Sequence, residues 1–268
     1  MVIYYHHSIK NLFTIQISKK MRIQTQTKIT KWFLLLVLGF SAQFASAYQH
    51  YVGTYVGDGA YQDVMIYNCW NFGNAFSGNP AVGGHNYRFD QYYYGAPYMF
   101  TTSNNSYADY EDFAFYCGHG SPYNLAMGSG AQVTNMPMGD AYAEFVTFFS
   151  CQTVVSAPES STWWTPYCNM FKGLHMLLGF RSLASAAQTD IPFDYAARLK
   201  ANWTVKDAWF SSIDDERYWI FNPSMSDGSP YPGFASCVVG SGHYSDRLGS
   251  YGSDPAAGCG GMYNYWQY

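Results

Sequence analysis

The stretch EDFAFYCGHGS, residues 111–121, joins an apolar run to a histidine that lies between two glycines. Short, continuous apolar runs are typical of strands buried on both faces of a parallel sheet. We therefore predict a strand over Asp112–Cys117, with His119 just beyond its carboxyl end. The glycines alone are equally compatible with a sharp turn, so a chemical role for His119 requires a partner elsewhere in the chain.

Several other segments repeat the pattern of a short apolar run followed by a helical stretch. AEFVTFFSC (Ala143–Cys151) and LHMLLGF (Leu174–Phe180) predict two more buried strands. Further strands are predicted over Tyr61–Cys69 and Tyr87–Tyr94, helices over residues 70–76, 169–173, 194–203 and 204–213, and strands and loops from Pro223 onward. The alternation favours an α/β fold with a mainly parallel central sheet flanked by helices.

The first 47 residues have the features of a secretory signal peptide. Lys28 and Lys31 precede the apolar run 32–40, and Ala45-Ser46-Ala47 has the form of a cleavage site. Met21 is the expected initiator, because residues 1–20 would be an unusually long lead. The apolar run is shorter than the roughly 20 residues that span a bilayer. We expect a secreted or periplasmic protein with no membrane span after signal cleavage.

Without residues 1–47, one domain remains over residues 48–268, with a Gly- and Tyr-rich extension from about residue 223. The leader holds six of the 14 Lys and Arg and none of the 18 Asp and Glu, which leaves 8 basic and 18 acidic side chains and a net charge of about −10. Such a charge repels phosphate backbones, so nucleic acid is excluded as a partner.

His119 and Cys151 both follow the carboxyl end of a predicted strand, where parallel sheets place their ligand sites. A cysteine nucleophile needs a base that takes its proton, and His119 can supply one. Gly120 has no side chain, so a carbonyl oxygen can approach its N–H closely. We predict His119 as base and acid, Cys151 as nucleophile, and the N–H groups of Gly120 and Cys151 as oxyanion donors.

A strand that ends in His-Gly, followed by a strand that ends in Ser-Cys, resembles the pattern of caspase-like cysteine peptidases, which include caspases, gingipains, separases and CHAT peptidases. Secreted bacterial domains of this type are most similar. The shared motifs, over about residues 50–220, are Gly118-His119-Gly120, Ser150-Cys151, Trp163-Trp164, FKGLHMLLGF (Phe171–Phe180) and Ala208-Trp209. The resemblance implies a three-layer caspase-like domain with a His119–Cys151 dyad and endopeptidase activity on peptide or protein substrates.

Gln152 departs from this pattern, because several related peptidases have Arg, Glu or Gly after the cysteine. Trp163 and Trp164 are candidates for a substrate cleft, and core packing is the alternative. No cofactor or metal is predicted, because the cysteines show no CxxC or Cys/His zinc spacing. A non-catalytic module that binds glycans or proteins on the same fold is the alternative function.

The cysteines and remaining histidines leave further alternatives. Cys237 and Cys259, which bracket a Gly/Ser-rich loop, are the predicted disulfide. A Cys117–Cys151 bridge would instead inactivate the dyad or act as a redox latch. His175 begins a buried strand and is expected to be a structural hydrogen-bonding residue, whereas His85 and His243 lie in loops and are expected to be solvated.

Overall fold

The computed structural model describes residues 49–76, 86–217 and 224–267, and Tyr48–Tyr268 form one compact unit. The predicted signal peptide and His85 lie outside the described residues. The elements, in chain order, are β1 (Gln49–Val56), α2 (Gln62–Phe76), β2 (Asn86–Tyr92), η2 (Pro97–Met99), η3 (Asn104–Ser106), β3 (Phe113–Cys117), β4 (Gly120–Ser121), β5 (Asn124–Leu125), β6 (Ala131–Gln132), η4 (Val133–Asn135), β7 (Phe145–Phe149), η5 (Thr165–Asn169), β8 (Met176–Phe180), α3 (Asp190–Lys200), α4 (Val205–Arg217), β9 (Ala235–Val239) and β10 (Tyr263–Trp266).

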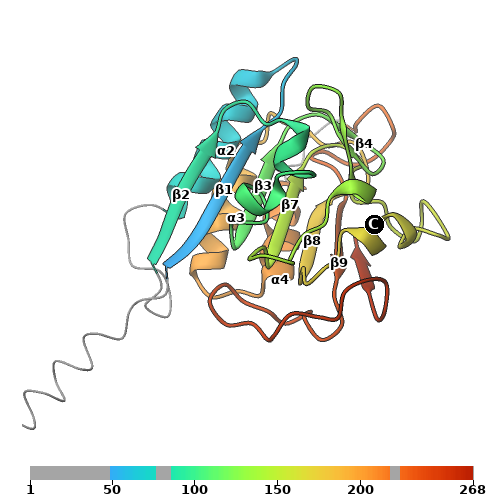
Figure 1. The fold of residues 1–268 in the computed structure, drawn as a ribbon. Coiled ribbons are helices and arrows are strands. Elements are labelled where there is room, and N and C mark those ends of the chain that lie inside the picture. The colour runs from blue at the N-terminus through green and yellow to red at the C-terminus, as the bar shows by residue number, and fades with distance from the viewer. Residues whose placement is uncertain (1–48, 77–85, 218–223, 268) are drawn as a thin grey trace, which may run out of the picture. The chain divides into compact units, whose positions relative to one another are not determined.

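Seven strands form one sheet in the order β10-β9-β8-β7-β3-β1-β2 (Figure 1). The pairs from β2 to β8 are parallel, whereas β9 is antiparallel to both β8 and β10. All five residues of β3, β7, β8 and β9 are buried, which explains their continuous apolar sequences. The predicted mainly parallel α/β sheet is confirmed.

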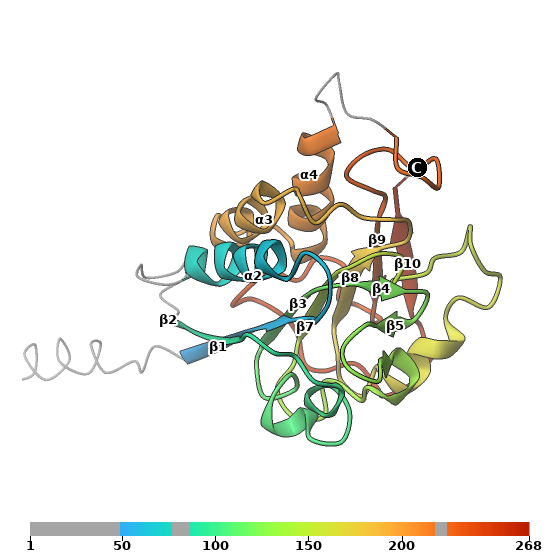
Figure 2. The ribbon, with the colours of Figure 1, turned by 90° about the horizontal axis from the view of Figure 1, so that it is seen from above.

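The sheet is the middle of three layers. Figure 2 shows α2, α3 and α4 on one face, and the opposite face carries the short strands β4 and β5. An apolar core lies on each side of the sheet: one includes Phe72, Phe113 and Trp209, and the other includes Tyr116 and Phe148. Alternating residues of each central strand therefore pack into opposite cores.

The strand predicted over Tyr61–Cys69 is wrong, because this segment begins helix α2. The buried residues Met65, Cys69, Phe72 and Phe76 recur at helical spacing and form one face. The apolar residues up to Cys69 are too few to distinguish the two-residue period of a strand from the 3.6-residue period of a helix. The helical period becomes clear only when the pattern is followed to Phe76.

The first strand of the sheet is β1, which the sequence pattern did not indicate. The residues after 223, predicted as an extension, supply β9 and β10 to the same sheet.

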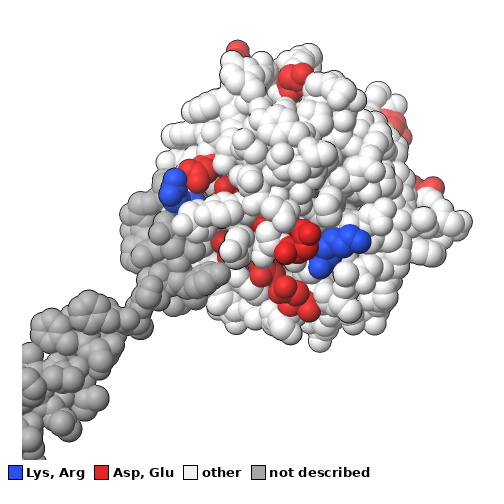
Figure 3. Space-filling model, in the orientation of Figure 1, with Lys and Arg blue, Asp and Glu red and all other residues white. Residues whose placement is uncertain are grey.

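The surface drawn in Figure 3 carries few charged side chains, in line with 12% charged residues, and acidic groups gather near its lower centre. Within the described residues, no helix combines the length and the apolar character that a membrane span requires.

Candidate active site

His119 and Cys151 line one cavity of about 380 Å³ at the carboxyl edge of the sheet. The cavity lies beyond the carboxyl ends of the parallel strands. The chain passes from β1 to β2 on one side of β1 and then returns to β3 on the other side of β1. Ligand sites of open α/β sheets occur where the strand order reverses in this way. The wall consists of Tyr61, Val64, Met65, Gly118, His119, Phe149, Ser150, Cys151, Ala184, Ser185, Ala186, Ala187 and Met225.

The end of β3 fixes the backbone of His119. The buried Tyr116 hydroxyl lies 3.0 Å from the carbonyl oxygens of both His119 and Ala126, to which it donates its hydrogen. A side chain on Gly118 would collide with this phenol, because an ideal Cβ there lies 2.2 Å from the Tyr116 oxygen. Gly118 is therefore required by close packing against Tyr116.

The His119 ring is oriented by a backbone group that the sequence could not reveal. Its Nε2 lies 2.9 Å from the carbonyl oxygen of Ala60, in the loop after β1. A carbonyl oxygen only accepts hydrogen bonds, so Nε2 carries the hydrogen and Nδ1 of the neutral ring has a free lone pair. This tautomer leaves Nδ1 as the nitrogen that can accept a proton.

Cys151 lies two residues after β7 and is half-buried. Its sulfur lies 3.3 Å from the backbone nitrogen of Ala184 and 3.4 Å from the carbonyl oxygen of the same residue. Ala184 belongs to the loop after β8. The amide N–H of Ala184 can therefore donate a hydrogen bond to a thiolate at Cys151.

The turn that carries Cys151 presses closely on Gly120. An ideal Cβ on Gly120 would lie 2.5 Å from Cγ2 of Thr153 and 3.0 Å from the carbonyl oxygen of Cys151. Gln152 has a left-handed φ of 55°, which is unfavourable for a residue with a side chain, and its N–H donates to the Ser182 carbonyl oxygen at 2.8 Å. The candidate nucleophile is therefore followed by a strained residue that the β8 loop holds in place.

The two predicted oxyanion donors have different surroundings. The Ala126 N–H donates to the His119 oxygen, so in the β4–β5 ladder Gly120 and Leu125 form a pair that does not exchange hydrogen bonds. The N–H of Gly120 therefore points away from β5. The N–H of Cys151 makes no hydrogen bond with any residue that the structure describes.

A family model described as a domain of unknown function, DUF6345, matches residues 68–257. The chain belongs to the DUF6345 family. The match includes His119 and Cys151 but not Ala60, whose carbonyl group holds the histidine.

Two solved structures of a secreted C11 cysteine protease from Bacteroides thetaiotaomicron are similar to this DUF6345 chain. One, in complex with an irreversible peptide inhibitor, has a TM-score of 0.44 and 8% identity and covers 71% of this chain and 65% of that one. The other, called iotapain, has a TM-score of 0.43 and 11% identity and covers 71% of this chain and 66% of that one. No curated protein matches. Likenesses this distant leave the chemistry to be argued from the residues of the present chain.

The predicted Cys237–Cys259 disulfide is wrong. Cys259 is bonded to Cys168, while Cys237 is a free cysteine in the middle of β9. Cys237 packs in the core beneath the helices, and burial raises the pKa of its thiol well above the usual range. A residue fixed there cannot meet the surface loop that carries Cys259.

Cys117 and Cys151 are both free, so they do not form the alternative bridge. Cys117 is fully buried in the core beneath the helices, beside Cys69 of α2. Burial, followed by the hydrogen bond with Cys117, raises the pKa of Cys69 well above its ordinary value. Among the free cysteines, only Cys151 is not buried.

Trp163 and Trp164 are absent from the described wall of the cavity. Trp163 packs at the edge of the core on the face opposite the helices, with its ring 6.3 Å from that of Tyr167. Trp164 is 43% exposed. The structure therefore supports the packing alternative for Trp163 and gives Trp164 no place beside Cys151.

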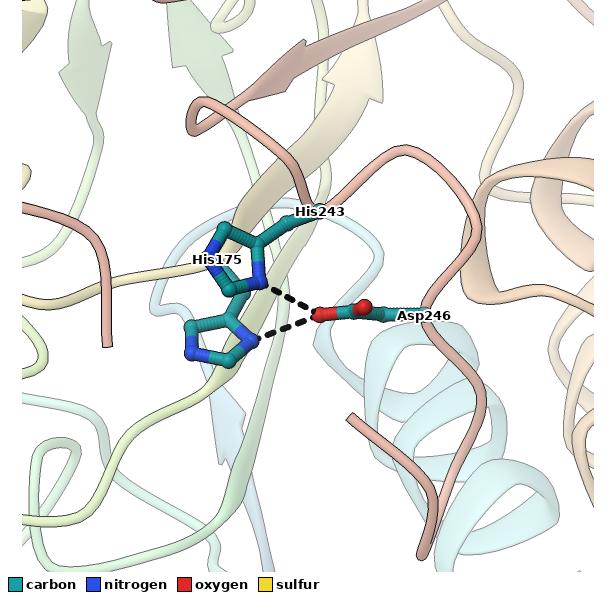
Figure 4. Close-up of side chains that lie close together, drawn as sticks. All are labelled: His175, His243 and Asp246. Carbon is teal, nitrogen blue, oxygen red and sulfur yellow. Dashed lines mark hydrogen bonds and ion pairs between the residues drawn. The ribbon is translucent and has the colours of Figure 1, made fainter. Parts of the chain in front are cut away.

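A second polar cluster lies at the opposite edge of the sheet, where β8 begins. In Figure 4 the rings of His175 and His243 point toward Asp246, and each Nδ1 lies 2.7 Å from its Oδ2. The expectation that His243 is solvated is wrong, because it is 5% exposed and held by Asp246. The structural role expected for His175 agrees with its complete burial and this hydrogen bond.

The charges around His175 set its protonation. Burial opposes the charged ring, but Asp246 and Glu144 outweigh burial and raise the pKa of His175 to about 9. Two groups have the spacing of metal ligands: His175 with His243 and Asp246, and His175 with Glu144 and Asp254. The sequence did signal this cluster, because Glu144 and His175 directly precede β7 and β8, which are neighbours in the sheet.

Proposed function

We propose that this chain is an exported cysteine peptidase that forms an acyl-enzyme on Cys151. The observation that carries the proposal is the shared cavity, in which the non-buried thiol lies with a histidine whose Nδ1 is left free by the Ala60 carbonyl. The Cys168–Cys259 disulfide supports export, because such bonds persist in oxidising compartments.

In the first step the S–H bond of Cys151 turns from the Ala184 oxygen to His119, and Nδ1 takes the proton. The sulfur attacks the carbonyl carbon of the peptide, and the π electrons of the C=O bond move to its oxygen. The N–H groups of Cys151 and Gly120 stabilise this oxyanion.

In the second step the oxyanion collapses and the C–N bond breaks, while His119 gives its proton to the leaving amine. This yields a thioester on Cys151 and a free amino terminus. His119 then takes a proton from a water molecule, which attacks the thioester and releases the carboxylic acid and the thiol.

The cavity wall indicates which substrates fit. No described wall residue is acidic or basic apart from His119. Val64, Met65, Phe149 and Met225 are apolar, and Ala184, Ala186 and Ala187 are small. We therefore propose that the substrate residue before the cleaved bond is uncharged and apolar, because a charged side chain would lose its hydration without gaining a partner.

The test uses activated peptidyl ketones that differ only in this residue, with Leu, Met, Lys or Asp. We expect Cys151 labelling with Leu or Met and none in the His119→Ala variant, with cleavage of the matching peptide lost in Cys151→Ala. The buried Cys69, Cys117 and Cys237 are internal controls for thiol access. Cleavage that survives in Cys151→Ala overturns the proposal. Labelling without cleavage of any peptide indicates a different hydrolase or transferase that uses the same dyad, whereas a binding module should retain its glycan or protein ligand in Cys151→Ala.

A further inference from the structure

The ring of His175 has one satisfied nitrogen and one that is not. Nδ1 donates to Asp246, whereas the buried Nε2 makes no hydrogen bond among the described residues. Nε2 nevertheless lies 2.9 Å from Oε2 of Glu144 and 3.9 Å from Oδ1 of Asp254. A buried nitrogen between two carboxylates requires positive charge at this point, either a proton or a cation.

The geometry distinguishes these two sources of charge. A proton on Nε2 is most effective along a straight N–H···O line, and the Glu144 oxygen lies close to Nε2 without meeting hydrogen-bond geometry. Two ligands about 2.1 Å from a shared tetrahedral ion, the usual geometry of Zn²⁺, are about 3.4 Å apart. The separations from Nε2, 2.9 Å to Oε2 of Glu144 and 3.9 Å to Oδ1 of Asp254, lie on either side of this value, and the exposed Asp254 can move to adjust them.

We propose that Glu144, His175 and Asp254 form a binding site for a divalent transition-metal ion of the Zn²⁺ class. The three ligand atoms lie within 4.8 Å of one another. Asp254 is 64% exposed, so its carboxylate can adjust and solvent can fill the remaining positions. An imidazole with two carboxylates suits Zn²⁺ better than Mg²⁺ or Ca²⁺, which favour oxygen ligands alone.

The surroundings of His175 are those of a metal-binding histidine. Such residues generally donate the second ring N–H to a carboxylate, which fixes the tautomer and directs the free nitrogen at the ion. Asp246 is that carboxylate, and His243 donates to the same oxygen and holds it in place (Figure 4).

The bound ion would tie the C-terminal loop to the sheet. Glu144 and His175 precede adjacent strands, and Asp254 lies between β9 and β10. The disulfide from Cys259 to Cys168 anchors the same loop a few residues later. The site is therefore a structural clamp, separate from the cysteine cavity at the other end of β7 and β8.

The experiment measures Zn²⁺ binding to the full chain by calorimetry after EDTA treatment and dialysis. All proteins carry Cys151→Ala, so that a Cys151–His119 pair cannot bind the ion and the result is independent of the proposed peptidase activity. We expect one equivalent of Zn²⁺, with affinity reduced by at least about 100-fold in Glu144→Gln and about 10-fold in Asp254→Asn. Asp63→Asn removes an exposed carboxylate at the other end of the sheet and is the matched control.

A variant could lose Zn²⁺ binding only because it is less stable. We therefore also measure how far Zn²⁺ shifts the thermal unfolding midpoint of each protein. Zn²⁺ should raise the midpoint of the parent and of Asp63→Asn, and should raise it little in the two ligand variants. The proposal is overturned if Zn²⁺ fails to bind, if the ligand variants bind it as the parent does, or if only Ca²⁺ binds. A protonated His175 would then supply the charge.

Discussion

Replacing Gly120 with alanine tests whether close packing around the Cys151 turn accounts for this glycine. The new Cβ would lie 2.5 Å from Cγ2 of Thr153 and 3.0 Å from both the Cys151 oxygen and the Ser150 hydroxyl oxygen. Carbon atoms pack at about 3.5–4.0 Å, so the first contact overlaps by about 1 Å. Thr153 cannot rotate freely, because its hydroxyl group is held by the hydroxyl and carbonyl groups of Ser150. We expect a loss of about 1–3 kcal/mol in the free energy of unfolding.

The displaced turn should also alter the reactivity of the thiol. A shift of about 1 Å in a reacting group costs on the order of 100-fold in rate, so Cys151 in Gly120→Ala should react much more slowly with the activated Leu ketone. Urea unfolding followed by tryptophan fluorescence gives the stability, and mass spectrometry gives the labelling rate.

Two variants make the prediction for Gly120 refutable. Thr153→Ser removes Cγ2 but keeps the hydroxyl group, so the double variant with Gly120→Ala should recover part of both losses. Gly260→Ala is the control, because nothing lies within 4 Å of a Cβ there and its φ is not left-handed. If Gly120→Ala unfolds at the same urea concentration as Gly260→Ala, the packing argument is wrong.

Three further changes have defined outcomes. Burial, with smaller contributions from Asp90 and Asp112 that outweigh Arg88, raises the pKa of Glu111 to about 8. The folded chain therefore holds a proton there that the unfolded chain releases above about pH 4.5, so urea titrations should show stability falling between pH 5 and 8, with a shallower fall in Glu111→Gln. Opening the Cys168–Cys259 bond, which joins residues 91 positions apart, should cost about 4.6 kcal/mol in the free energy of unfolding, measured by urea titration of Cys168→Ser/Cys259→Ser against the oxidised parent. Tyr116→Phe should lose about 1–2 kcal/mol and slow Cys151 labelling, because the carbonyl groups of His119 and Ala126 lose their shared donor; unchanged labelling would show that this hydroxyl group does not position His119.

Sequence analysis located β3, β7 and β8, which are covered on both faces, and also the edge strand β2, predicted over Tyr87–Tyr94 and found over Asn86–Tyr92. β3, β7 and β8 are buried at all five positions, so each appears in the sequence as a continuous apolar run. A run this short is typical of a buried strand, because buried helices are usually longer. β1 was not located, because QHYVGTYV contains polar residues and glycine and gives no continuous run. Local pattern therefore identified the middle of the sheet and its edge strand β2, but not β1, which pairs in parallel with β2 and β3.

The candidate site divides along a similar line. His119 and Cys151 carry a signal because each follows a predicted strand, and the rule that such ends meet at one edge brings them together. The groups that orient them are backbone atoms of Ala60 and Ala184, and no residue type marks a backbone carbonyl or amide. Cys237 points from β9 into the buried core, so it cannot pair with Cys259, which is bonded to Cys168 instead. The spacing of cysteines along the chain does not show which face of a strand a cysteine occupies.

The same edge rule, applied to the beginnings of the strands, places the second cluster. β7 follows Glu144 and is followed by Ser150-Cys151, while β8 follows His175 and leads to Ala184. Each strand has five residues, a length of roughly 17 Å at about 3.3 Å per residue. The two sites therefore share two buried strands but no side chain. Because the strands are held on both sides by parallel neighbours or β9, changes at Glu144 should reach Cys151 only through movement of the sheet as a whole, and loss of a clamp at the distal edge should reduce stability before it alters the thiol.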